Sequence, residues 1–194
     1  MSDELVIEYN GNAIVIRFTR PEIRNPLSIT VLEQLHRIVD DLSIDHAIST
    51  VIFTGTGESF ASGADLREIA AVSPDNAPDF ARKGQELMTK ITLLPQTTIA
   101  AINGFCFGGA LDFALACDRR IASSNAKFAH PGAGLGIITG WGGTQRLPRL
   151  IGQAAALELF FTASPIDAEK ALRVGLIHEI GNDPLSTALS KCKG

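Results

Sequence analysis

The chain has few cysteines, few aromatic residues and no excess of positive charge. Its 194 residues include three cysteines and one tryptophan, and the formal net charge is −4 at pH 7. An odd number of cysteines without a regular framework is typical of reduced thiols, so we expect a cytoplasmic protein. Because no basic field surrounds the chain, we expect no binding to nucleic acid.

Long apolar runs are also missing. The apolar stretches are too short and too often interrupted to span a bilayer, so we expect no membrane association. The N-terminal residues Met-Ser-Asp-Glu-Leu lack the apolar core of a secretion signal. Since 45% of the 194 residues are hydrophobic, the chain can bury one core, and a single domain is the expectation.

Apolar runs and helical patterns alternate along the sequence, which indicates α/β architecture. Residues 5–8 and 13–18 predict a hairpin turned at 10–12. Thr30, followed three residues later by Glu33, has the pattern of a capping box and predicts a helix start. Further strands are expected near 48–54, 97–102 and 119–122, and further helices near 65–71, 77–93, 108–116, 153–161 and 167–173.

The most informative segment runs from Asn103 to Asp118, where a glycine-rich turn passes directly into an apolar helix. Gly108 and Gly109 fall at the helix start, where backbone N–H groups have no intrahelical partner. Asp112 lies one turn later, so we expect its carboxylate on the face of that N–H. A donor for an oxyanion beside an acid or base suits acyl chemistry. The alternative is a plain tight turn with a dipole-compensating aspartate.

A second turn of the same kind, leading into a helix start, spans Phe60 to Arg67. The residues before it, 50–54, have the pattern of a buried strand, and Leu66 and Ile69 begin a helical pattern. Ala64 therefore falls at or just before a helix start, again with a free N–H. Two such donors can converge on one carbonyl oxygen, as the polarisation of a thioester requires.

With three further segments, these motifs resemble the crotonase superfamily, the enoyl-CoA hydratases and isomerases. The resemblance implies a ClpP/crotonase-like spiral of stacked ββα units. It implies a core domain over 1–181 and a short remnant over 182–194, with the family's C-terminal helical tail largely absent. The matching segments are 20–28, 60–67, 103–118, 140–152 and 168–171 followed by 175–178.

The resemblance also implies the parts of a site for an acyl-CoA thioester, with coenzyme A entering as part of the substrate and no other cofactor or metal. The backbone N–H groups of Ala64 and Gly109 form the oxyanion hole, and Asp112 is the catalytic carboxylate. For Asp65 and Asp118, local capping and loop hydrogen bonds explain the carboxylates better than chemistry does. Residues matching substrate- or CoA-binding positions are Arg24, Ala61, Gly63, Asp65, Leu66, Arg67, Gly108 and Trp141. A homo-oligomer, a trimer or hexamer, is expected, and it is weaker if the tail is missing.

One position departs from the family pattern. Where a typical hydratase has its second catalytic glutamate, this chain has Gly132. His130, two positions earlier, is a possible substitute base because histidine titrates near neutrality. We favour the other interpretation, in which His130 forms loop hydrogen bonds. Trp141 is expected to form a wall of the acyl pocket.

Three hypotheses on function remain. The first is an enzyme of the hydratase/isomerase group that uses Asp112 alone. Its class is enoyl-CoA hydratase, although efficient hydration is doubtful, and isomerisation, thioester hydrolysis and decarboxylation are open alternatives. The second is a catalytically silent acyl-CoA binder, and the third is a structural subunit of a larger assembly.

Overall fold

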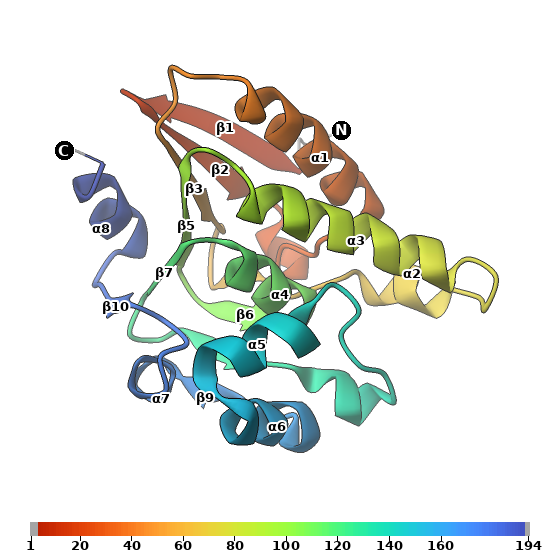
Figure 1. Cartoon of the computed structure of the whole chain (residues 1–194). Helices are drawn as coiled ribbons and strands as arrows, with labels where there is room; N and C mark the ends of the chain where they lie inside the picture. The colour runs from red at the N-terminus through yellow and green to blue at the C-terminus, as the bar shows by residue number, and fades with distance from the viewer. Residues whose placement is uncertain (1–3, 193–194) are drawn as a thin grey trace.

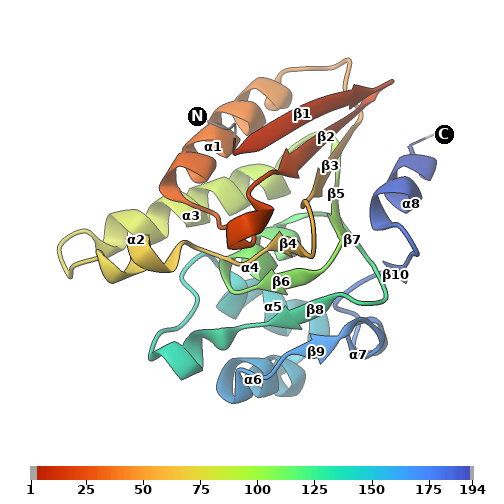
Figure 2. The same cartoon turned by 180° about the vertical axis from the view of Figure 1, so that it is seen from behind.

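Two β-sheets of different size organise the chain in this computed structural model, which describes residues 4–192 (Figures 1 and 2). The larger sheet has the order β1-β2-β3-β5-β7-β10, and the smaller has the order β4-β6-β8-β9. The strands are β1 (Leu5–Asn10), β2 (Ala13–Phe18), β3 (Thr50–Thr54), β4 (Ser59–Ala61), β5 (Thr97–Ile102), β6 (Phe105–Phe107), β7 (Arg119–Ala122), β8 (Lys127–Ala129), β9 (Ile166–Asp167) and β10 (Glu179–Ile180).

The chain repeats one path: a strand of the larger sheet, a short strand of the smaller sheet, then a helix. β3, β4 and α2 follow this path, as do β5, β6 and α4, with parallel pairing inside each sheet. The stacked ββα spiral expected from the resemblance is therefore confirmed. The helices are α1 (Ile29–Ser43), α2 (Leu66–Ala70), α3 (Ala77–Thr92), α4 (Gly109–Ala116), α5 (Gly143–Ile151), α6 (Gln153–Thr162), α7 (Ala168–Arg173) and α8 (Pro184–Ser190), with 3-10 turns η1 (Pro21–Ile23) and η2 (Pro131–Leu135).

Both faces of the larger sheet are covered, because side chains alternate along its strands. In β3, Val51 and Phe53 belong to the main core, whereas Ile52 faces the other way and packs near Ala188 of α8. Figure 1 shows α8 on the side of the sheet opposite α1 and α3. Residues 184–190 thus dock on the sheet, while the division of the chain at residue 181 stays a prediction.

The hairpin and the regions of the expected helices are confirmed, but the start of α1 differs from the prediction. The cap is Ser28, whose Oγ accepts from the Val31 N–H at 3.1 Å, and not Thr30. Glu33 does not close a capping box; it pairs with Lys83 of α3 at 2.9 Å. The predicted capping box was wrong because serine two residues earlier serves as the N-cap.

Candidate functional site

Two backbone N–H groups meet at the ends of β4 and β6. Gly108 has φ 54° and precedes α4, which begins at Gly109, so the N–H of Gly109 points out of the helix start. Ala64 bridges to Leu27 just before α2. A Cβ placed on Gly109 would lie 3.4 Å from the Ala64 nitrogen. Within residues 4–192 neither N–H has an acceptor, so both are available to a ligand.

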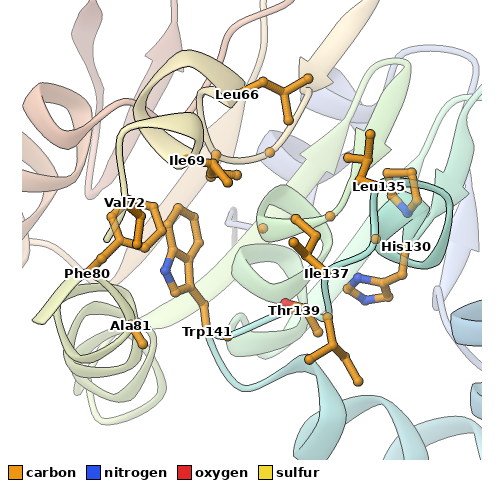
Figure 3. Close-up of a pocket in the computed structure, with 18 of the residues that line it drawn as sticks. Leu66, Ile69, Val72, Phe80, Ala81, His130, Leu135, Ile137, Thr139 and Trp141 are labelled. Atoms are coloured by element: carbon orange, nitrogen blue, oxygen red, sulfur yellow. The ribbon is translucent and has the colours of Figure 1, made fainter. Parts of the chain in front are cut away.

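An apolar cavity of about 430 Å³ adjoins these N–H groups (Figure 3). Leu66, Ile69 and Val72 come from the α2 region, and Trp141 lies across from Ile137 and Thr139. The expected position of Trp141 in the pocket wall agrees with this lining. Further lining residues are Ala64, Ala77, Phe80, Ala81, Gly108, Gly109, His130, Gly132, Leu135, Ile138 and Gly140.

Asp112 is not among the residues that line the cavity. Its side chain is fully buried, and its Oδ2 accepts a hydrogen bond from the Thr139 hydroxyl. Its Oδ1 has no hydrogen-bond partner of good geometry in the described part of the chain, although the backbone N–H groups of Gly143 and Trp141 lie near the carboxylate and favour its ionised form. Burial raises the pKa of Asp112 to about 6, although the hydrogen bond from Thr139 favours the ionised form. The position of its carboxylate on the face of the Gly109 N–H stays a prediction, because the side chain is not among those that line the cavity.

His130 is not a loop hydrogen-bonder, so the favoured interpretation from the sequence was wrong. Its side chain is 3% exposed, and neither ring nitrogen has a hydrogen-bond partner among residues 4–192. The ring lies against Phe160, with 4.9 Å between centroids, and its Nε2 is 3.5 Å from Oδ1 of Asp112. Burial lowers the pKa of His130 to about 4, so the ring is neutral at pH 7.

Gly132 leaves the second carboxylate position without a side chain. It lines the cavity at the start of the segment that runs to Gly140. A Cβ on Gly132 would lie 2.5 Å from the Ile137 carbonyl oxygen, so the local backbone leaves no room for a glutamate. None of the described residues that line the cavity is acidic.

A second hollow of about 690 Å³ continues outward from Ala64 and has both predicted arginines in its wall. Arg67 is 79% exposed and pairs with Asp65 at 2.6 Å. Asp65 also caps α2, because its Oδ1 accepts from the Arg67 N–H at 2.9 Å. Gly63 shapes this junction with φ 99°, and its carbonyl accepts from the Leu27 N–H at 2.8 Å. Contacts of Arg24 and Arg67 with CoA phosphates stay predictions.

Ala61 and Asp118 support the fold and lie outside the cavity. Ala61 is buried in β4. Asp118 accepts from the backbone and hydroxyl of Thr98 at 2.8 and 2.9 Å, as the loop interpretation expects. The sequence analysis missed Thr139, which holds Asp112 from 27 positions away. No local motif marks such a contact, because it forms only when α4 and the segment before α5 pack together.

The family model described as enoyl-CoA hydratase/isomerase matches residues 8–190. The chain belongs to the enoyl-CoA hydratase/isomerase family. It is 40% identical to the short-chain-enoyl-CoA hydratase of Clostridium acetobutylicum over 92% of this chain and 69% of that protein.

Solved structures support the same family membership. The crystal structure of enoyl-CoA hydratase from Bacillus anthracis matches with a TM-score of 0.93 and 35% identity, over 97% of this chain and 75% of that one. DspI of Pseudomonas aeruginosa matches with a TM-score of 0.93 and 34% identity, over 98% of this chain and 73% of that one. The fold of this family member is therefore that of the enoyl-CoA hydratases.

Residues 4–192 have neither a membrane-spanning helix nor a cluster of metal-binding side chains. None of the helices in this region has the length and apolar character needed to cross a membrane. The same residues contain no group of three or more His, Cys, Asp or Glu side chains arranged to hold a metal ion.

The stability of this hydratase/isomerase family member is expected to depend on pH through two opposing groups. Burial raises the pKa of Asp112 from 3.8 to about 6, so its contribution to stability is present below 3.8 and is lost as pH rises through 6. Burial lowers the pKa of His130 from 6.5 to about 4, so its contribution is present above 6.5 and is lost as pH falls through 4.

Single variants show the direction of each contribution, although the two groups lie 3.5 Å apart and titrate as a coupled pair. Relative to the parent protein, Asp112→Asn is expected to lose stability as pH falls from about 6.5 to about 4, because only His130 remains. His130→Gln is expected to gain stability over the window from about 6 down to about 4. Urea unfolding across this range measures both trends, and parallel curves for the parent and both variants would contradict them.

Proposed function

We propose that this chain binds an acyl-CoA thioester with the carbonyl oxygen between the N–H groups of Ala64 and Gly109. The enolate formed beside that carbonyl is stabilised by the same two donors. The observation that carries the proposal is the pair of unpartnered N–H groups beside an apolar cavity. Coenzyme A is part of the substrate, and Arg24 and Arg67 meet its phosphates along the outer hollow.

The reaction we propose is a proton transfer that shifts the double bond, in preference to hydration. Hydration needs one group to deprotonate water and another to deliver a proton to carbon. None of the described residues that line the cavity is a carboxylate, and Gly132 stands where a typical hydratase has its second one. Moving a double bond needs one acid–base system that carries a proton between two carbons. Asp112 supplies the carboxylate of that system.

The test compares two substrates on the purified chain. A short 3-enoyl-CoA is expected to gain the absorbance of the conjugated 2-enoyl thioester at a rate that depends on Asp112. A short 2-enoyl-CoA is expected to lose that absorbance slowly or not at all. Fast hydration of the 2-enoyl-CoA would contradict the preference for isomerisation and would require a second acid–base group.

A silent acyl-CoA binder is the second candidate, and the burial of Asp112 favours it. The carboxylate is fully buried and does not line the cavity. Trp141, the only tryptophan, reports occupancy of the cavity by its fluorescence. Binding of acyl-CoA without turnover of either enoyl-CoA would support this candidate. The homo-oligomer and the cytoplasmic location stay predictions.

A further inference from the structure

His130 is held beside the proposed oxyanion hole by strand pairing. β6 and β8 run in parallel with Phe107 opposite Ala129, and the Gly108 N–H donates to the Ala129 carbonyl at 2.9 Å. His130 is the next residue, so it lies alongside Gly108 and Gly109. It lines the acyl cavity, whereas Asp112 does not. Of these two side chains, the histidine is therefore the one that borders the cavity.

The two ring nitrogens of His130 have different surroundings. Nε2 faces Oδ1 of Asp112 at 3.5 Å, and among the described residues this oxygen has no hydrogen-bond partner of good geometry. Nδ1 has no partner within residues 4–192. A carboxylate beside one nitrogen stabilises the tautomer that leaves the other nitrogen as an acceptor, and it stabilises the imidazolium when a proton arrives.

We propose that His130 takes the proton from the bound acyl thioester and that Asp112 positions His130 and stabilises its protonated form. This inference rests on the proposed function, because it assigns the base of that enolate-forming site. It makes His130 the catalytic residue and Asp112 a positioning residue. The resting protonation states leave the ring able to accept a proton: burial lowers the pKa of His130 to about 4 and raises the pKa of Asp112 to about 6. At pH 7 the ring is therefore a free base and the carboxylate is ionised.

Access to His130 is through the segment 132–140. The nitrogens of His130 are closed to solvent in this structure, and the exposed residues 133–138 lie over this side of the cavity. Glycines at 132, 134, 136 and 140 give that backbone freedom to move. Thr139 of the same segment binds Asp112, so a shift that admits the acyl group acts directly on the pair.

The step balances as a reversible proton transfer. Nδ1 of neutral His130 accepts the α-proton, and the electrons of that C–H bond form the enolate. The enolate oxygen lies between the N–H groups of Ala64 and Gly109, and Nε2–H of the imidazolium donates to Asp112. The proton then returns to the α-carbon, or to the γ-carbon of a 3-enoyl group, and the imidazole is neutral again.

Exchange of the α-protons of butyryl-CoA in D2O tests this step without a double bond. The parent chain is expected to exchange them, and mass spectrometry measures the rate. His130→Gln is expected to lower that rate at saturation by about 10²–10⁴-fold, and Asp112→Asn by about 10²-fold or more. The double variant is expected to be no slower than His130→Gln, because the two residues act as a unit. His46→Gln, at an exposed loop position, is the matched control and keeps the parent rate.

Two further measurements test the inference even if His130→Gln folds poorly. Free imidazole is expected to restore part of the exchange in His130→Ala and none in Asp112→Asn. The 15N shifts of the His130 ring are expected to differ between the parent and Asp112→Asn at neutral pH, since the carboxylate fixes the tautomer. Equal shifts would overturn the positioning role of Asp112.

The outcomes separate this inference from the proposed function. Parent-like exchange in His130→Gln overturns the inference. If Asp112→Asn loses exchange while His130→Gln keeps it, the inference is overturned and Asp112 itself is the base. If the parent chain binds butyryl-CoA but exchanges no protons, the proposed function fails together with this step. The two failures differ in the parent chain: it exchanges no α-protons if the proposed function fails, and it still exchanges them if only the inference fails.

Discussion

Gly109→Ala is expected to lower turnover of an acyl-CoA by about 10²–10³-fold while CoA itself still binds. A methyl group on Gly109 would lie 3.4 Å from the Ala64 nitrogen, in the space proposed for the thioester oxygen. It would also lie 2.5 Å from Cζ3 of Trp141, so the indole must move. The change therefore removes the geometry of one donor and disturbs the cavity wall, but it leaves the outer hollow intact. Isomerisation of a 3-enoyl-CoA, or α-proton exchange, measures the loss.

Two controls accompany this variant. Circular dichroism and urea unfolding check that α4 still forms. Binding of free CoA, which has no acyl group to place in the oxyanion hole, is expected to change little. Parent-like turnover by a folded Gly109→Ala protein would mean that the thioester oxygen does not lie between Ala64 and Gly109.

Phe113→Ala is expected to have the largest effect on stability, a loss of about 3–5 kcal/mol in the free energy of unfolding. The Phe113 ring is fully buried and meets Phe53 edge-on at 4.8 Å and Phe18 at 5.8 Å between centroids. Truncation leaves a cavity where α4 packs on the larger sheet, and neighbouring rings cannot fill it without leaving their own contacts. Urea unfolding at neutral pH measures the loss.

The matched control is Phe161→Ala on α6. Phe161 is 77% exposed, so the same truncation is expected to change the free energy of unfolding by less than about 0.5 kcal/mol. Similar losses for both variants would show that the aromatic cluster around Phe113 does not contribute the stability assigned to it.

Elements with strong local patterns were predictable. β7 was predicted at 119–122 and is found there, and α3 and α4 lie within one residue of their predicted ends. The free N–H of Gly109 was also predictable, because a glycine pair at a helix start needs no tertiary information. The cap of α1 was mispredicted because Ser28 and Thr30 are both good N-caps, and local sequence does not rank them.

The short strands of the smaller sheet were not predicted. β4, β6 and β8 have three residues each, too few for an alternating pattern to stand out. α5 was missed as well, since it begins with glycine and contains Pro148. These elements depend on partners from distant parts of the chain, because pairing between β6 and β8 satisfies backbone groups that neither strand satisfies alone.

The sequence alone determined the family and the positions of the two backbone donors, Ala64 and Gly109, because both depend on short-range motifs. The ββα order followed only from the resemblance to the family, since the short strands of the smaller sheet have no local pattern. The roles of the donors and of the arginines stay predictions. Only the tertiary structure decided the surroundings of Asp112 and His130. Their side chains meet at 3.5 Å because α4 packs beside the end of β8, and Thr139 reaches Asp112 from a third segment. Such contacts join residues far apart in the chain, and burial among them sets both pKa values. A local sequence pattern carries no information about that burial.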